Sequence, residues 1–241
     1  MNILITGTSR GIGRATALKF LKAGHKVIGL DIKEDTISSS IKNPENYQHI
    51  IADISKKESL PECKDFPILK KVEILINNAG IQSICSDKNS FCIEDINVNL
   101  IGTINVTEKY AFQPSIKSVL FNSSVSSLTG NEFPSYVASK AGVTGYMKNC
   151  AIRLANKYKA TCNALCFGGV MTELNKPVID DKILWQKIMD ITPLKKWMTA
   201  EEAAEWCFFI TVTNSFCTGQ AIDISGGERN CADLFVWPED I

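Results

Sequence analysis

Short apolar runs alternate with helix-like stretches along almost the whole chain, and this alternation restricts the fold more than any other feature. The runs expected to form strands span residues 2–6, 26–31, 49–52, 72–77, 119–123, 161–166 and 221–224. The clearest helical patterns lie at residues 13–23, 98–110, 136–157 and 200–210. Strands that are apolar almost throughout and separated by helices predict a parallel sheet covered on both faces. We therefore expect a doubly wound α/β fold whose ligand site lies at the carboxyl ends of the strands.

The chain of 241 residues is expected to form one domain, since single α/β domains of about 200–250 residues are common. No repeat or low-complexity linker divides it, and the polar segment 33–48 is expected to be a surface connection. Residues 172–198 have no clear place in the sheet and include Leu184, Trp185 and Met189. Two interpretations stay open for this segment: a substrate lid with an apolar inner side, or a helix pair packed on the core.

Charge and composition exclude several classes of protein. The formal net charge is zero, so nothing favours binding to nucleic acid or to an anionic membrane. No apolar run is long enough to span a bilayer, and the first residues lack a secretory signal pattern, so we expect a cytoplasmic protein. The nine cysteines and two histidines have no zinc-ligand spacing, which predicts buried thiols and no metal site.

A glycine-rich loop follows the first expected strand and opens the first expected helix, where the sequence reads TGTSRGIG over residues 6–13. Glycines let the backbone approach a pyrophosphate closely, and a helix N-terminus offers unpaired N–H donors to an anion. A glycine triplet alone is weak, but a strand before it and a helix after it strengthen the interpretation. The residues predicted to contact a dinucleotide here are Gly7, Ser9, Arg10, Gly11, Ile12 and Gly13.

The choice of cofactor depends on two residues of opposite charge. Asp31 ends the second expected strand, where a carboxylate accepts hydrogen bonds from the adenosine ribose hydroxyls and repels a 2′-phosphate. Arg10 in the glycine loop could instead pair with such a phosphate. A fixed carboxylate should outweigh one flexible, exposed cation, so we predict NAD, with NADP as the alternative.

The spacing of the glycine loop resembles that of the short-chain dehydrogenase/reductase family, and further motifs follow in the family's order over about residues 3–227. They are Asp53-Ile54, Asn77-Asn78-Ala79-Gly80, Asn99, Ser123-Ser124, Tyr136 with Lys140, and Gly219. The resemblance implies a Rossmann fold and an NAD(P)-dependent oxidoreductase that interconverts an alcohol and a carbonyl. It also implies that Asp53 and Ile54 contact adenine and that Asn78, Ala79 and Gly80 line the cofactor site.

Tyr136 and Lys140 are four residues apart in a helical stretch, so they share one face of the helix. A tyrosine with a pKa near 10 is a poor base at neutral pH, and a nearby ammonium stabilises the phenolate. Lowering that pKa by about three units requires roughly 4 kcal/mol, which suits a desolvated pair together with a cationic nicotinamide. In the family-based interpretation Tyr136 is the general acid and base, Lys140 also holds the nicotinamide ribose, and Ser124 polarises the substrate oxygen.

Several family-based assignments leave alternatives open. Asn99 either holds a water for proton relay or forms a structural bridge between strands. Ser124 fits the family's serine motif best, whereas Ser123 has the commoner spacing to Tyr136. Gly168, Val170 and Thr172 are expected beside the nicotinamide.

Phe167 stands where the family usually has proline, and it removes a rigid turn there.

Two other functions compete with this interpretation: a dinucleotide-sensing regulator without chemistry, and a sugar-nucleotide epimerase of the extended family. A regulator has no need for serine, tyrosine and lysine together, and little chain remains after residue 172 for a substrate domain. The apolar lid residues favour an apolar or partly apolar carbonyl, but sugars, acyl thioesters and steroids stay open as substrates. The resemblance also implies a homo-oligomer, either a dimer or a tetramer.

Overall fold

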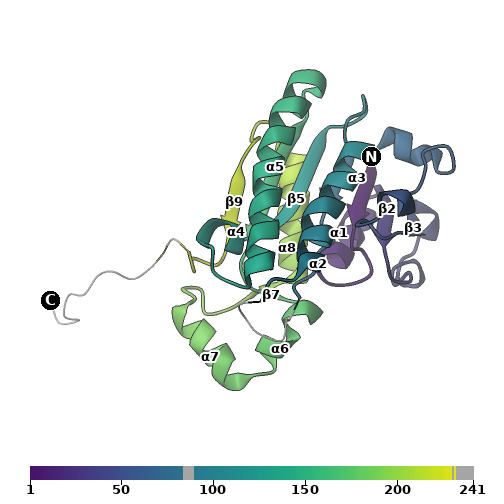
Figure 1. Ribbon diagram of the computed structural model, residues 1–241. Helices are drawn as coiled ribbons and strands as arrows, with labels where there is room; N and C mark the ends of the chain where they lie inside the picture. Colours follow the sequence, from purple (N-terminus) through teal and green to yellow (C-terminus); the bar gives the residue numbers. More distant parts are fainter. Residues whose placement is uncertain (84–89, 230, 232–241) are drawn as a thin grey trace.

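The computed structural model describes residues 1–83, 90–229 and 231 of the chain. Seven strands form one parallel sheet in the order β3-β2-β1-β4-β5-β6-β9 (Figure 1). The strands are β1 (Asn2–Thr6), β2 (Lys26–Asp31), β3 (Tyr47–Ile51), β4 (Ile74–Asn77), β5 (Ser118–Ser124), β6 (Thr161–Phe167) and β9 (Ala221–Ile224). The order reverses between β1 and β4, which makes their carboxyl ends the switch point of a doubly wound sheet. The expected fold class is confirmed.

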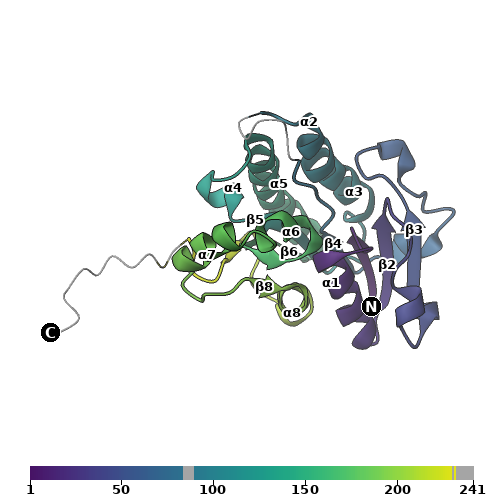
Figure 2. The same ribbon diagram turned by 90° about the horizontal axis from the view of Figure 1, so that it is seen from below.

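Helices cover both faces of the sheet. Figure 2 shows α3 (Thr103–Tyr110) and α5 (Pro134–Tyr158) on one side, and α1 (Gly11–Lys22) and α8 (Ala200–Phe208) on the other. The smaller helices are η1 (Ser38–Ser40), η2 (Pro44–Asn46), η3 (Lys57–Ser59), η4 (Pro67–Lys71), α2 (Ile93–Asp95), η5 (Ile96–Gly102), α4 (Ser126–Thr129), η6 (Glu173–Asn175), α6 (Lys176–Ile179), α7 (Lys182–Ile191) and η7 (Phe209–Thr213).

Two apolar layers hold the helices against the sheet, because successive strand residues point to opposite faces. Ile3 and Ile5 pack with Phe20 of α1 in one layer, whereas Leu4 packs with Met147 of α5 in the other. All five side chains are fully buried. This explains why the strands read as continuous apolar runs in the sequence.

Local signals place several helix ends as expected. Gly24 follows α1 with a φ of 80°, which suits a glycine just past a helix. Thr199 accepts a hydrogen bond from the Glu202 N–H while the Glu202 carboxylate accepts one from the Thr199 N–H, a complete capping box at α8. The helix expected at residues 98–110 instead begins as the π-helical turn η5 before continuing as α3.

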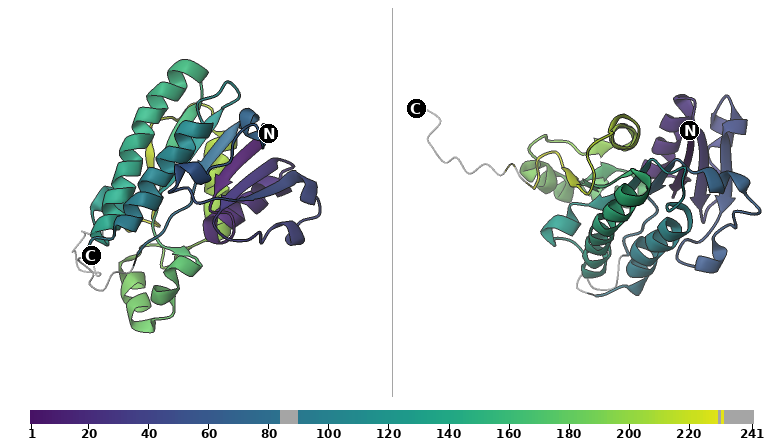
Figure 3. Two further views of the ribbon diagram at one scale, coloured as in Figure 1. Left: turned by 45° about the vertical axis from the view of Figure 1, so that its right-hand side comes forward. Right: turned by 90° about the horizontal axis from the view of Figure 1, so that it is seen from above.

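Residues 172–198 lie beyond the carboxyl ends of the strands, where α6 and α7 project below the sheet (Figures 1 and 3). A second sheet, which the sequence pattern does not predict, anchors this segment at both ends. In it β7 (Val170–Met171) pairs in parallel with β8 (Met198–Thr199). The segment is therefore a helix pair fixed at the edge of the sheet where the ligand site is expected.

The cysteines are mostly thiols of the core. Cys150, Cys162, Cys166 and Cys207 are buried and free, as expected. Cys92 departs from the expected buried thiols, because its sulfur is disulfide-bonded. Within residues 1–83 and 90–229 no His, Cys, Asp and Glu side chains gather into a group that could hold a metal. None of the helices in the described part of the chain is long and apolar enough to cross a bilayer.

Candidate active site

Two adjoining cavities lie where the strand order of the sheet reverses. The Tyr136 cavity, of about 480 Å³, is lined by the ends of β5 and β6, the first turns of α5 and the α6–α7 segment. The Asp31 cavity, of about 220 Å³, is lined by the loop after β1 and the end of β2. Ile12, Asn78 and Gly80 line both, so the two cavities form one groove. This groove lies where doubly wound sheets bind ligands.

The glycine loop forms a wall of the Asp31 cavity. Gly7 has a φ of 75° and donates its N–H to the Leu30 carbonyl at 2.7 Å. Gly7 and Gly11 line the cavity, whereas Gly13 lies behind the loop, where a Cβ would come within 2.0 Å of the Gly7 oxygen. The buried Ser9 turns its hydroxyl to the Glu34 carbonyl at 2.9 Å rather than to either cavity. Gly13 and Ser9 therefore shape the loop and do not line the groove.

Asp31 and Arg10, the two residues on which the cofactor choice depends, line the same cavity. The Asp31 carboxylate accepts hydrogen bonds from the N–H groups of Ser9 and Lys33, each at 2.9 Å, so its position is fixed. Arg10 is exposed. Asp53 and Ile54 also line this cavity, and a hydrogen bond from Ser55 holds the pKa of the Asp53 carboxyl below its usual value.

Asn78 ties together the ends of three strands. Its side-chain amide donates to the carbonyls of Thr6 and Gly7 at 3.0 and 3.2 Å and accepts a hydrogen bond from Asn122 at 2.9 Å. The hydroxyl of Thr6 accepts hydrogen bonds from the N–H groups of Asn78 and Ala79. These bonds set the glycine loop against β4 and leave Ala79 and Gly80 lining the groove.

Tyr136, Lys140 and Ser124 meet in the Tyr136 cavity. Helix α5 begins at Pro134, so Tyr136 lies in its first turn and Lys140 one turn later. The Lys140 Nζ lies 5.7 Å from the centroid of the Tyr136 ring and donates to the Asn122 carbonyl at 3.0 Å. A Cβ on Gly80 would lie 3.1 Å from Asn99 Oδ1 and 3.4 Å from this Nζ, so Gly80 lies close to both side chains and its tighter neighbour is Asn99.

Burial controls the protonation of this pair. It raises the pKa of Tyr136 to about 12, against a smaller lowering by a hydrogen bond with Ser124. Burial also lowers the pKa of Lys140 to about 8. The protein groups by themselves thus keep Tyr136 a neutral phenol. The lowered Tyr136 pKa expected from the sequence is not found in the protein groups alone, because burial shifts this pKa in the opposite direction.

The two candidate serines differ in what their hydroxyls touch. Ser123 Oγ lies 3.3 Å from the Lys140 carbonyl and 3.1 Å from Thr144 Oγ1, so it faces α5. Ser124 Oγ is hydrogen-bonded to Ser126 Oγ at 2.7 Å. A hydrogen bond between the Ser124 and Tyr136 side chains also lowers the pKa of the Tyr136 phenol. The geometry therefore favours Ser124 as the serine beside Tyr136.

Asn99 lies in the π-helical turn η5, and its side chain is fully engaged. Its amide exchanges two 2.8 Å hydrogen bonds with the backbone of Ile81 and donates to Ser139 Oγ at 3.0 Å. This is the arrangement of a structural bridge, one of the two alternatives for this residue. It bridges a loop and a helix, however, and not two strands. A π-helical turn is often found at functional sites.

The chain after β6 brings the remaining expected residues to the groove. Gly168, Val170 and Thr172 line the Tyr136 cavity, and Thr172 also lines the Asp31 cavity. A Cβ on Gly11 would meet the Thr172 methyl at 3.5 Å, so Thr172 lies against the glycine loop. Phe167, at the position where the family usually has proline, is buried and lines the Tyr136 cavity. The next residue, Gly168, also lines this cavity, and its N–H donates a hydrogen bond to the Ile224 carbonyl at 3.0 Å.

Leu184, Trp185 and Met189, for which substrate contact and core packing were both open, lie outside the lining of the groove. Met189 is buried, Trp185 packs edge-on against Trp197 at 5.1 Å, and none of the three lines the Tyr136 cavity. The apolar side chains of this segment that reach the cavity are Leu174, Val178, Ile188, Ile191 and Trp197. A helical pattern shows which residues share a face but not which neighbour that face meets, so the sequence left both alternatives open.

Several lining residues were not predicted. Val98, adjacent to Asn99, lines the Asp31 cavity, and Gln82, Glu132 and Arg229 line the Tyr136 cavity. Gln82 follows the Asn78-Ala79-Gly80 motif by two residues and Glu132 precedes Tyr136 by four, so proximity to motifs is a signal that could have found them. Arg229 comes from the segment after β9 and had no such signal.

Comparisons with known proteins identify the family of this chain. The sequence model of a family described as short chain dehydrogenase matches residues 1–183. The chain is 31% identical over 238 residues to the 3-oxoacyl-[acyl-carrier-protein] reductase FabG of Thermotoga maritima, with 93% of this chain and 96% of that protein covered. Two solved structures have TM-scores of 0.83. One is 4-hydroxyisoleucine dehydrogenase complexed with NADH, at 26% identity, covering 95% of this chain and 98% of that one. The other is a candidate 2-deoxy-D-gluconate 3-dehydrogenase of Agrobacterium tumefaciens with bound NADP, at 25% identity, covering 94% and 95%.

Proposed function

Because the chain belongs to the short-chain dehydrogenase family, whose members act as oxidoreductases on CH–OH groups, we propose that Tyr136 exchanges a proton with the oxygen of an alcohol or carbonyl substrate. The observation that carries this proposal is the meeting of Tyr136, Lys140 and Ser124 in one cavity at the switch point of the sheet. A hydroxyl that donates to the substrate oxygen in reduction can accept the same proton in oxidation.

The groove fits a nicotinamide dinucleotide, which when bound supplies or accepts the hydride. Gly7, Arg10, Gly11 and Ile12 would lie beside the phosphates, where the N-terminus of α1 offers N–H donors. The lack of side chains at Gly7 and Gly13 supports this assignment, since a Cβ at either position would contact backbone within 3.0 Å. Asp53 and Ile54 would face the adenine, and Gly168, Val170 and Thr172 the nicotinamide.

We propose NAD as the preferred cofactor. The Asp31 carboxylate is held by two backbone N–H groups at the end of β2, whereas Arg10 is an exposed loop residue. A fixed negative charge beside the ribose disfavours a 2′-phosphate, and a solvated guanidinium compensates only weakly for it.

The three residues at the reaction centre would have separate roles. Ser124 donates a hydrogen bond to the substrate oxygen and positions it. Tyr136 is a neutral phenol in the site without cofactor, which is the form that can donate a proton in reduction. Lys140, with a pKa near 8, is largely an ammonium at neutral pH and stabilises negative charge that develops on Tyr136. The segment 172–198 would cover the substrate, with Ile188 and Ile191 on its inner side.

The first test measures the change in nicotinamide absorbance over a panel of alcohols and carbonyls, with NAD(H) and NADP(H) offered in parallel. We expect turnover with NAD(H) that falls by at least a thousandfold in Tyr136→Phe, while the dissociation constant of the dinucleotide stays within about threefold. Turnover confined to NADP(H) would show that Arg10 outweighs Asp31. Unchanged turnover in Tyr136→Phe would reject the assigned chemistry, and tight dinucleotide binding without any turnover would favour a sensor.

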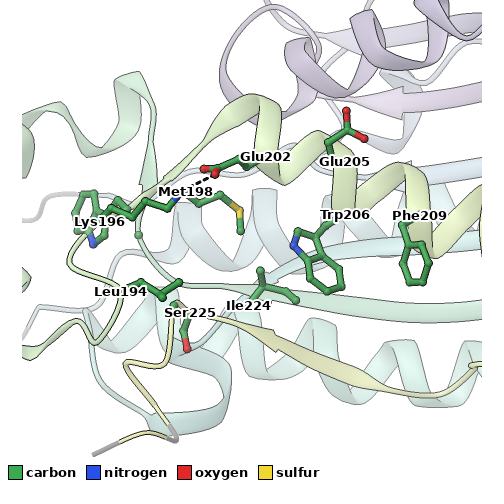
Figure 4. Close-up of a pocket in the computed structure, with 12 residues that line it drawn as sticks. Leu194, Lys196, Met198, Glu202, Glu205, Trp206, Phe209, Ile224 and Ser225 are labelled. Carbon is green, nitrogen blue, oxygen red and sulfur yellow. Dashed lines mark hydrogen bonds and ion pairs between the residues drawn. The ribbon is translucent and has the colours of Figure 1, made fainter.

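We also propose that the chain forms a homo-oligomer through the surface of α8 and β9. A third cavity, the Trp206 cavity, measures about 570 Å³ and lies between these two elements (Figure 4). In this view Trp206 of α8 and Phe209 of η7 lie above Ile224 of β9, and the Lys196–Glu202 ion pair lies at one end. Strand β9 is also an edge of the sheet. An edge strand beside exposed aromatic side chains favours contact with a second copy of the same surface.

A further inference from the structure

Glu132 has a backbone conformation that costs it free energy. Its φ is 122°, a value that residues with a side chain rarely adopt. The other two described residues that share a positive φ without being glycine, Lys159 and Lys195, have values of 57° and 51°, which lie in or near the left-handed helical region. Glu132 stands in the short turn between Gly130, itself left-handed, and Pro134, the first residue of α5. Glycine would be the least strained residue at this position, so the side chain of Glu132 needs another explanation.

The carboxylate of Glu132 lines the Tyr136 cavity, and Glu132 lies four residues before Tyr136. Gln82, on the facing loop, donates a hydrogen bond from Nε2 to Glu132 Oε2 at 2.6 Å. Glu132 is close enough to Tyr136 for its charge to raise the pKa of the phenol. The second oxygen, Oε1, accepts no hydrogen bond from the described residues. Gln82 therefore holds the carboxylate in place, and one oxygen stays open to a ligand in the cavity.

The charges around this cavity balance. Among the residues that the structure describes, the charged side chains that line it are two carboxylates, Glu132 and Glu228, and two cations, Lys140 and Arg229. Arg229 is also within 3.5 Å of Asp223. A cavity of this composition favours a substrate without net charge. The described lining also includes hydroxyl and amide groups, among them those of Gln82, Ser126, Thr129 and Asn131.

From the strained backbone, the held carboxylate and the balanced charge, we propose that Glu132 is the residue that selects the substrate of this enzyme, and that the substrate is a neutral polyhydroxylated carbonyl or alcohol, a sugar or polyol. The carboxylate oxygen accepts a hydrogen bond from a hydroxyl beside the reacting carbon. A bound substrate without such hydroxyls displaces water from Oε1 and leaves that one oxygen without a hydrogen bond, while Gln82 still holds Oε2, and it is disfavoured for that reason. This inference rests on the proposed oxidoreductase function.

The test compares the wild type with Glu132→Gly, Glu132→Gln and Lys159→Gly. The last is a matched control, because it also replaces a residue with positive φ by glycine, but at the exposed end of α5. Two readouts are used in the presence of dinucleotide: the shift in unfolding temperature on adding aldoses or polyols, and steady-state turnover of the same compounds and of simple unhydroxylated alcohols.

We expect wild type and Lys159→Gly to bind and turn over polyols alike. Glu132→Gly should unfold at a higher temperature without ligand, and its KM for polyols should rise at least thirtyfold while kcat changes less than threefold. Glu132→Gln, which keeps the side-chain shape, should raise KM about tenfold. Turnover of unhydroxylated alcohols should rise in Glu132→Gly, because no carboxylate is left there to disfavour them, and should not change in Lys159→Gly. Dinucleotide affinity should stay within threefold in all variants.

The outcomes separate this inference from the proposed function. Polyol binding that depends on Glu132 without turnover of any compound would reject the chemistry and keep the assignment of Glu132. Turnover of unhydroxylated alcohols in preference to polyols, or equal losses of kcat on all substrates in Glu132→Gly, would overturn the assignment of Glu132 and leave the chemistry standing.

Discussion

At the scale of single residues, the reaction centre is built at a cost to stability. Lys140 is only 7% exposed, and its surroundings lower its pKa from 10.5 to about 8. Holding an ammonium there is unfavourable for folding, and one hydrogen bond to the Asn122 carbonyl compensates only in part. Glu132 likewise lowers the stability of the fold, because its backbone is held at a φ of 122° that residues with a side chain rarely adopt. Residues that a fold alone would not select are concentrated around Tyr136.

Replacement of Lys140 by methionine should therefore abolish activity without lowering stability at neutral pH. Below pH 8 the wild type buries a charge that its unfolded state leaves in water, and between pH 8 and 10.5 the unfolded state binds the additional proton. The stability of the wild type should thus rise with pH across that window. Removing the buried ammonium is expected to recover about 3 kcal/mol of unfolding free energy, which is the size of the Lys140 pKa shift. The variant also leaves the Asn122 carbonyl without its hydrogen bond, which costs about 1–2 kcal/mol.

Urea unfolding at pH 7 and pH 10 measures this prediction. Lys140→Met should be as stable as the wild type or more stable by about 1–2 kcal/mol at pH 7, and the difference should shrink at pH 10. A variant that is less stable than the wild type at pH 7 and recovers at higher pH would contradict the assigned cost of burial.

At the scale of elements, the sequence predicts what local chemistry decides. Apolar strands, Gly24 after α1 and the Thr199 cap of α8 follow from neighbouring residues, and the structure has them close to where they were expected. The family motifs likewise brought Tyr136, Lys140 and Ser124 to one cavity. The two-residue strands β7 and β8 were not predicted, because their pairing joins residues 170 and 198 across the three helices η6, α6 and α7. The inner residues of the α6–α7 segment and Glu132 depend on such long-range contacts too.

The capping box at Thr199 offers a test of an element on its own. Thr199→Ala removes the acceptor of the 3.1 Å bond from the Glu202 N–H at the start of α8, where it packs on α1. Loss of such a cap typically costs about 1 kcal/mol of unfolding free energy. Chemical denaturation should show this decrease, with kcat unchanged, whereas Glu201→Gln in the same turn should change stability by less than about 0.5 kcal/mol. An equal loss in both variants would mean that the cap contributes nothing specific.

At the scale of the whole molecule, the two edges of the sheet differ in what surrounds them. Beside β9, the exposed side chains include Leu194 (65%), Trp206 (39%) and Phe209 (50%), and they border the Trp206 cavity. Gly169 and Trp197 line both this cavity and the Tyr136 cavity, so one wall separates the proposed interface from the substrate. A Cβ on Gly169 would lie 1.9 Å from the Trp197 ring, which shows how tightly that wall is packed. Association and substrate binding should therefore be linked.

Trp206→Glu tests this link. A charge in the centre of an apolar contact disfavours association, because the carboxylate loses water without gaining a partner. Light scattering should give the wild type a mass of a dimer or tetramer and the variant the 26.6 kDa of one chain. Since Trp197 would lose the support of the neighbouring copy, we expect KM to rise several-fold in the variant.

Ile51→Ser replaces an apolar residue that is 57% exposed on β3, the opposite edge, and should change neither mass nor KM. A wild type that is already monomeric would reject the interface, and a monomeric variant with unchanged KM would separate assembly from the substrate site.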